Sequence, residues 1–148
     1  MGTDRSDQRG TPVTYEPILV SLPVGDRVRA HEFYVAGLGL RAIGEPADDG
    51  VPEPLLFELN PLARLMLVPT VGFGWVIGDH EVATPGSSEC VLGIGAASDE
   101  EVQEIVERAR SAGAVVATEP APQPWGHAAA FTDPDGHVWT VTSAKLPG

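Results

Sequence analysis

The sequence is poor in cysteine and in basic residues. Its 148 residues include one cysteine and nine lysine or arginine residues against 21 aspartate or glutamate residues, which gives a formal net charge of −12. A lone cysteine forms no internal disulfide, so the fold must rest on a hydrophobic core, which a domain of this length supplies. The negative charge disfavours binding to the phosphate backbone of nucleic acids, and we expect no nucleic-acid partner.

Long hydrophobic runs are also absent. No stretch approaches the roughly 18 apolar residues that span a bilayer, and anionic lipid surfaces repel a negatively charged chain. We therefore expect no membrane partner. The first dozen residues are polar and lack the apolar segment of a secretory signal. We expect residues 1–14 to form a disordered N-terminal tail and the protein to be cytoplasmic.

The first half of the remaining chain predicts one strand, then a helix and three shorter strands. Residues 16–24 alternate between two faces as a strand does, and Asp26 is a suitable helix N-cap residue. Apolar residues then recur at helical spacing until the Gly-Leu-Gly-Leu segment at 37–40 ends the helix. Extended segments follow at 40–44, 55–59 and 64–68, separated by residues typical of turns.

The second half repeats this order. A strand is expected at 90–97, and Ser98 with Glu101 forms the capping box that begins a helix. Three strands follow at 115–118, 127–132 and 138–143. The sequence thus predicts one α+β domain, residues 15–148, with an internal duplication. It consists of two modules, 15–68 and 89–144, joined by a glycine-containing bridge, 69–88, that is mobile or sharply turned.

Two motifs relate this pattern to a known family. They are Phe33-Tyr34 followed by Gly37-Leu38-Gly39-Leu40, and Phe131 followed by Asp133-Pro134-Asp135-Gly136-His137 and Trp139. With them the chain resembles the vicinal oxygen chelate superfamily, which includes glyoxalases, extradiol dioxygenases, fosfomycin-modifying enzymes and bleomycin-resistance proteins. The resemblance spans roughly residues 15–144. It implies an α+β fold in which two tandem βαβββ modules form paired half-barrels around a cavity.

Many members of this superfamily hold a divalent metal at four cavity-facing positions. The resemblance places these positions at Leu19 and Met66 in the first module and at Val91 and Thr140 in the second. None of them supplies the imidazole, carboxylate or thiolate group that such an ion requires. Glu89 lies near Val91, but one carboxylate alone is not a metal site. We therefore expect no metal and no other cofactor.

The same resemblance indicates which side chains line the cavity. These positions are apolar or small with a few hydroxyl groups, as is typical of a ligand pocket. Gly93 either makes room for a ligand or relieves strand curvature, and Trp75 and Trp125 either stack on a ligand or pack within their loops. His127 is the histidine best placed to donate a hydrogen bond or to act as a base. The predicted ligand-binding residues are Leu19, Ser21, Met66, Val68, Trp75, Val91, Gly93, Trp125, His127 and Thr140.

The remaining polar candidates have simpler structural roles. His31, His80 and His137 are expected to be solvated or to lie in turns. Asp133 and Asp135 shape the backbone of their own turn, which disfavours a catalytic pair of carboxylates. We therefore assign no catalytic residue.

Together these observations favour a metal-free small-molecule binding protein of the glyoxalase/bleomycin-resistance type, with a ligand that is planar and either apolar or cationic. Members of the superfamily commonly pair, so we expect a homodimer with part of the contact in residues 69–88. One alternative is a lyase or dioxygenase of the same superfamily, which the apolar cavity disfavours, or a cofactor-free catalyst that uses His127. Another is a scaffold with a vestigial pocket, which nothing in the sequence distinguishes from a binding protein.

Overall fold

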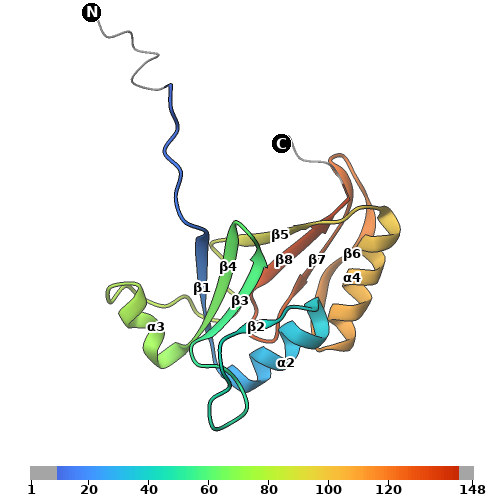
Figure 1. Ribbon diagram of the computed structural model, residues 1–148. Helices are drawn as coiled ribbons and strands as arrows, with labels where there is room; N and C mark the ends of the chain where they lie inside the picture. Colours follow the sequence, from blue (N-terminus) through green and yellow to red (C-terminus); the bar gives the residue numbers. More distant parts are fainter. Residues whose placement is uncertain (1–9, 144–148) are drawn as a thin grey trace, which may run out of the picture.

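The computed structural model describes residues 10–143 and contains two modules of the same topology (Figure 1). The first comprises β1 (Ile18–Val24), α2 (Arg27–Leu38), β2 (Ala42–Ile43), β3 (Leu55–Asn60) and β4 (Ala63–Pro69). The second comprises β5 (Val91–Gly95), α4 (Asp99–Ser111), β6 (Val115–Gln123), β7 (Gly126–Thr132) and β8 (Val138–Thr142). The predicted α+β fold of two tandem βαβββ modules is therefore confirmed. Residues 1–9 of the expected tail and residues 144–148 lie outside the described range.

Each module forms its own four-stranded sheet. The strand order is β1-β4-β3-β2 in the first sheet and β5-β8-β7-β6 in the second. The first and last strands of each module run parallel, and the other neighbouring strands run antiparallel. β1 and β5 are consequently edge strands within their sheets, paired on one side only.

The two long helices begin at capped N-termini, as predicted. The side chain of Asp26 accepts hydrogen bonds from the N–H groups of Val28 at 3.0 Å and Arg29 at 3.2 Å. The hydroxyl of Ser98 accepts from the N–H of Glu101 at 3.1 Å. These contacts satisfy backbone donors that have no partner inside a helix. None of the helices within residues 10–143 has the length and apolar character needed to cross a membrane.

One hydrophobic core joins the two modules. It combines buried side chains from α2, α4 and both sheets, including Phe33, Tyr34, Phe57, Val102, Phe131 and Trp139. The contact between the modules is concentrated where α2 meets α4 (Figure 1). A Cβ atom added to Gly37 of α2 would lie 3.1 Å from the Cβ of Ala112, so the lack of a side chain at Gly37 permits this close approach.

Because the modules meet through their helices, the opposite face of each sheet lies outside the core. We call these two surfaces the outer faces. Strand alternation places the positions that were expected to face a cavity on them: Leu22 and Val24 of β1 are buried, whereas Leu19 and Ser21 point the other way. A ligand-binding site is therefore expected on one of the outer faces.

The bridge between the modules contains a helix, α3 (Thr70–Val76), that the sequence did not predict. Its Phe73 is buried, and the hydroxyl of Thr70 donates to the carbonyl of Val24 at 3.1 Å. Its two glycines are poor helix formers, so this short helix depends on packing against β1 and β4. The chain then turns at residues 78–79, both of which have positive φ.

Strand β6 is longer than predicted. It continues to Gln123 through Pro120 and Pro122. Proline lacks an N–H group, and it is accommodated here because β6 lies at the sheet edge and pairs only with β7. The register of this pair shifts between Val116 and Thr118 and again before Ala121, which interrupts the simple alternation of side chains.

Candidate functional site

A partly open hollow of about 160 Å³ lies on the outer face of the second sheet. It is formed by β6, β7 and β8 together with the turn between β6 and β7. All of its lining residues are uncharged, and most are small. They are Thr118, Gln123, Trp125, Ala128, Ala129, Ala130, Thr140 and Thr142.

The floor of this hollow follows from strand alternation. Every second residue of β8 is buried in the core, which turns Thr140 and Thr142 to the outer face. Thr140 lies opposite Ala130 of β7, and Thr142 lies opposite Ala128. Two rows of short side chains therefore cross these strands and leave a shallow, flat surface.

Two glycines extend the flat surface across β5. Gly93 lies opposite Thr140, and Gly95 lies opposite Thr142. A Cβ atom on Gly93 would lie 3.4 Å from the Oγ1 of Thr140, whereas a Cβ atom on Gly95 would have no atom within 4 Å. Neither glycine has a positive φ, so the backbone conformation does not itself require glycine at these positions.

Trp125 stands at the edge of the hollow, in the turn between β6 and β7. Its side chain is 63% exposed although it is one of the largest apolar groups of the chain. The following residue, Gly126, has a φ of 131°, which few residues other than glycine adopt. This turn therefore holds an indole ring beside a surface of small side chains, where it is free to stack on a flat molecule.

The predicted site residues of the first module do not line this hollow. Leu19 and Ser21 lie on the outer face of β1, and Met66 and Val68 lie on that of β4. Ser21 is opposite Met66 in the parallel β1–β4 pair. Leu19 is 50% exposed, and the other three side chains are partly buried. These residues form a separate surface on the first sheet.

Two further predicted residues are exposed at other places. Val91 is on the outer face of β5 and is 53% exposed. Trp75 is on α3 and is 88% exposed. Of the predicted ligand-binding residues, the structure thus brings Trp125 and Thr140 together in the hollow, with Gly93 beside Thr140.

His127 lies on the other face of β7. It shares that face with the buried residues Ala129 and Phe131 and is not part of the lining of the hollow. Its Nδ1 is 4.0 Å from the Oδ2 of Asp99, at the start of α4. The hydroxyl of Ser143 donates to the other oxygen of the same carboxylate at 2.6 Å. His127 is therefore placed to interact with α4, on the opposite side of the strand from Ala128 and Ala130.

Of the other histidines, His80 and His137 lie in or next to turns as expected, whereas His31 is a half-buried residue of α2 and not a solvated one. The ring of His31 stacks on Phe57, with centroids 6.2 Å apart. The Nδ1 of His80 is 2.8 Å from the carbonyl oxygen of Ile77. His137 lies in a turn, but its Nε2 is also 2.6 Å from the carbonyl oxygen of Pro23, so it links the two modules.

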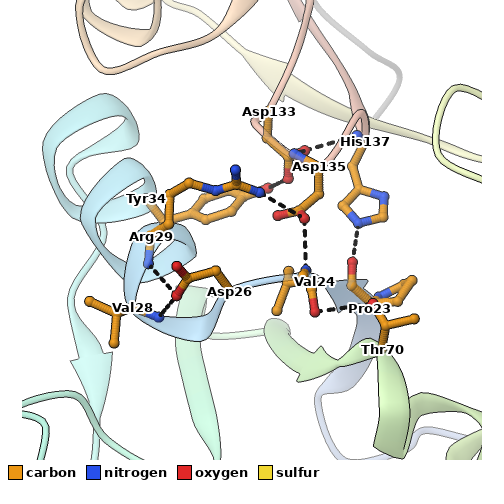
Figure 2. A network of polar contacts seen from close by, with 11 residues as sticks. Pro23, Val24, Asp26, Val28, Arg29, Tyr34, Thr70, Asp133, Asp135 and His137 are labelled. Atoms are coloured by element: carbon orange, nitrogen blue, oxygen red, sulfur yellow. Dashed lines mark hydrogen bonds and ion pairs between the residues drawn. The ribbon is translucent and has the colours of Figure 1, made fainter.

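Figure 2 shows the polar network around this turn. The hydroxyl of Tyr34 donates to the Oδ2 of Asp133 at 2.5 Å, and the Nε1 of Trp139 donates to the Tyr34 oxygen at 3.1 Å. The Oδ1 of Asp133 accepts from the N–H groups of Asp135 and His137, both at 2.9 Å. Burial, followed by the negative charge of Asp133, raises the pKa of Tyr34 well above its usual value. The network is buried and structural.

Asp135 adds a second connection between the modules. Its Oδ1 accepts from the N–H of Gly25 at 2.8 Å and from the guanidinium group of Arg29 at 3.3 Å (Figure 2). The role of Asp133 within its own turn was predicted from the sequence and is confirmed. The contacts that this turn makes with the first module were not predicted, because they join residues about one hundred positions apart.

The side chains at the four metal positions do not fit a divalent ion. Leu19, Met66 and Val91 offer no suitable donor, and the hydroxyl of Thr140 is a neutral one. Within residues 10–143, no three His, Cys, Asp or Glu side chains are grouped so that they could hold a metal. The chemistry of this surface is that of apolar contact and neutral hydrogen bonding.

Some residues of the hollow escaped sequence analysis. Ala128 and Ala130 alternate with Phe131, and the burial of Phe131 in the structure shows that they lie on the outer face, opposite Thr142 and Thr140 respectively. Thr118 and Gln123 gave no such signal, because the register shifts in β6 make the orientation of its side chains impossible to count from the sequence.

Comparisons with known proteins agree with this architecture. The model of the Glyoxalase/Bleomycin resistance protein/Dioxygenase superfamily matches residues 17–141. No curated protein matches the sequence closely enough to be compared.

Solved structures of the same fold are numerous. A glyoxalase-related enzyme from Fulvimarina pelagi is 23% identical, with a TM-score of 0.73, over 87% of this chain and 88% of its own. A hypothetical protein from S. aureus is 21% identical, with a TM-score of 0.72, over 93% and 98%. TnmS3, an antibiotic binding protein from Streptomyces sp. CB03234, is 25% identical, with a TM-score of 0.61, over 91% and 100%. As the motifs at Phe33–Leu40 and Phe131–Trp139 predicted, the chain belongs to the Glyoxalase/Bleomycin resistance protein/Dioxygenase superfamily.

Proposed function

We propose that this protein binds a small, flat, largely apolar molecule in the hollow of the second sheet, without a metal ion. The observation that carries the proposal is the pairing of an exposed indole, Trp125, with a floor of small, uncharged side chains. A flat ligand would be sandwiched between them. Stacking on an aromatic ring contributes about 0.5–1.5 kcal/mol beyond the burial of apolar area.

The size of the hollow limits what it holds by itself. An empty volume of about 150 Å³ accommodates a single benzene ring, and the hollow has about 160 Å³. A ligand of two or more rings would therefore extend over the bare surface at Gly93 and Gly95. In a single chain such a ligand would keep much of its apolar area in water, so tight binding requires something to cover it.

We propose that a second copy of the chain provides this cover and that the protein is a homodimer. On the outer face of the first sheet the apolar side chain of Leu19 is 50% exposed, and α3 exposes Val71 and Trp75, which are 95% and 88% accessible. The edges of β1 and β5 are unpaired within the described chain. Exposed apolar faces and free strand edges of this kind are typically covered by a partner.

The comparison with TnmS3 supports sequestration as the biological role. That protein is an antibiotic binding protein, and its structure aligns with 91% of this chain. The uncharged lining supports binding in preference to metal-assisted catalysis, since it offers no metal donor. Both observations support the proposal that this chain acts by binding an antibiotic-like molecule.

The test is a calorimetric titration with a panel of aromatic natural products, using the parent protein, Trp125→Ala and the conservative control Trp125→Phe. Loss of the ring should weaken binding of a hit several-fold, whereas Trp125→Phe, which keeps a stacking surface, should retain most of the affinity. If no compound binds the parent, the chain is better described as a scaffold. If Trp125→Ala binds as tightly as the parent, the hollow is not the site.

A further inference from the structure

We propose that the ligand of this hollow is neutral and carries hydrogen-bonding groups along one edge. These groups form hydrogen bonds with the hydroxyls of Thr140 and Thr142. This inference rests on the proposed function, since it concerns the same surface. It narrows the ligand class from flat apolar molecules in general to flat molecules with a polar edge.

The threonine hydroxyls of the hollow are free to bind a ligand. Elsewhere in the chain a threonine hydroxyl is used within the fold, as where Thr70 donates to the carbonyl of Val24. The hydroxyls of Thr140 and Thr142 make no hydrogen bond with other groups of residues 10–143, and both residues line the hollow. Water satisfies them until a ligand displaces it.

The spacing of Thr140 and Thr142 sets the length of the polar edge that the ligand needs. The two residues are two positions apart on one strand and point to the same face, which separates them by about 6.6–6.8 Å. Beside them on β7, Ala128 and Ala130 present only methyl groups. A flat molecule that covers these alanines and reaches across β8 to Gly93, on whose side the Oγ1 of Thr140 lies, would therefore place its hydrogen-bonding groups at the two hydroxyls.

Gly93 keeps one of these hydroxyls accessible. The Oγ1 of Thr140 is on the side of β5, since a Cβ atom on Gly93 would lie 3.4 Å from it. The Cβ atom of a side chain at position 93 would therefore contact this oxygen. Gly95 has no such neighbour, because a Cβ atom there would meet nothing within 4 Å. The two glycines thus differ in function although they lie on the same strand and face.

The charge of the lining selects a neutral ligand. None of the residues around the hollow is ionisable to a carboxylate or an ammonium group. A cation buried here would lose hydration without gaining an opposite charge, and a hydrocarbon edge would leave the hydroxyls without partners. A threonine hydroxyl both donates and accepts, so phenol, carbonyl and amide groups all satisfy it.

The test uses two probes of similar shape, 2,7-dihydroxynaphthalene, which has both hydroxyls on one long side, and 2,7-dimethylnaphthalene, which has none. Binding to the parent, Thr140→Val and Thr140→Ser is measured by NMR titration in the same co-solvent. We expect the parent to prefer the diol by about three- to ten-fold for each hydrogen bond formed. Thr140→Val should lose the part of this preference that is due to Thr140, and Thr140→Ser, which retains a hydroxyl, should keep it.

A matched pair of glycine variants tests the role of Gly93. Gly93→Ala should weaken binding of the diol, and Gly95→Ala should leave it close to the parent value. Unchanged melting temperatures would show that neither variant acts through the stability of the fold.

The outcomes separate this inference from the function on which it rests. If both probes bind the parent equally well, a flat ligand site is supported and the polar edge is refuted. A preference for the diol that survives Thr140→Val would refute the assignment to Thr140. If neither probe binds, the hollow is not a site for flat molecules and both proposals fail.

Discussion

The two modules share one topology but differ in the side chains on their outer faces. In the first sheet this face carries bulky or charged residues, among them Leu19, Leu56, Glu58, Arg64 and Met66. In the second it carries glycine, alanine and threonine at Gly93, Gly95, Ala128, Ala130 and Thr140. The hollow beside Trp125 lies on the second sheet. The duplication thus provides two equivalent scaffolds, and the size of a few side chains determines the shape of each outer face.

In contrast to their outer faces, the cores of the two modules form one unit. Phe57 in the first module and Phe131 in the second are both fully buried and belong to the same hydrophobic cluster. We expect Phe57→Ala and Phe131→Ala each to lower the free energy of unfolding by about 3–5 kcal/mol. Both variants should still unfold in a single transition, measured by urea denaturation with circular dichroism. Two separate transitions in either variant would show that the modules fold independently.

The dimer proposal predicts that the exposed side of α3 contributes more to self-association than other exposed apolar residues do. A central tryptophan in an interface typically contributes 2 kcal/mol or more, so Trp75→Ala should weaken self-association by about 30-fold. The control is Val35→Ala, on the exposed side of α2, which should have no effect. Sedimentation velocity over a range of protein concentrations measures the self-association of both variants. A parent protein of 15.5 kDa at all micromolar concentrations would contradict the proposal.

Exchanging corresponding residues tests the difference between the outer faces directly. Met66 is opposite Ser21 as Thr140 is opposite Gly93, so the two positions are equivalent in their modules. Thr140→Met should fill the hollow and reduce binding of a flat probe by at least about ten-fold, a loss of about 1.4 kcal/mol. The reciprocal change, Met66→Thr, should weaken binding less, because Met66 does not line the hollow. Equal effects of the two variants in a titration would mean that both faces contact the ligand.

The polar network that joins the modules predicts that the free energy of unfolding depends on pH in the alkaline range. The pKa of Tyr34 is raised in the folded protein above its usual value of 10.0, so the folded state retains a proton that the unfolded state releases. This contribution is fully present below about pH 10 and is lost as the pH rises above it, by at most about 1.4 kcal/mol per pH unit. The free energy of unfolding of Tyr34→Phe, measured between pH 8 and 11, should decline less steeply than that of the parent. Parallel curves would show that Tyr34 ionises alike in both states.

Much of the fold could be predicted because its signals are local. Asp26 and Ser98 begin their helices as helix caps do, and alternation in β1 and β8 sorts buried from exposed positions. The helix α3 could not be predicted, since it depends on packing of Phe73 in the completed fold. The candidate site was found only in part for a related reason. Thr140 follows from alternation, whereas the separation of the two outer faces depends on how α2 and α4 pack.

His127 illustrates the limit of reasoning from position in a strand. Its place near the start of β7 suggested access to a ligand, but residues 127 and 128 point to opposite faces, and the sequence HAAAFT leaves the choice open until Phe131 is known to be buried. The buried aromatic residue of a strand is therefore a better guide to orientation than the polar residue that attracts attention.

The prolines of β6 have a consequence for the behaviour of the protein at high concentration. Pro120 and Pro122 occupy the outermost strand of the second sheet, next to the hollow, and neither has an N–H group with which another strand could pair. Sheet extension by a neighbouring molecule is therefore blocked on the side of the hollow. The flat, exposed surface beside this edge is thereby protected from the cross-β stacking that leads to fibrils.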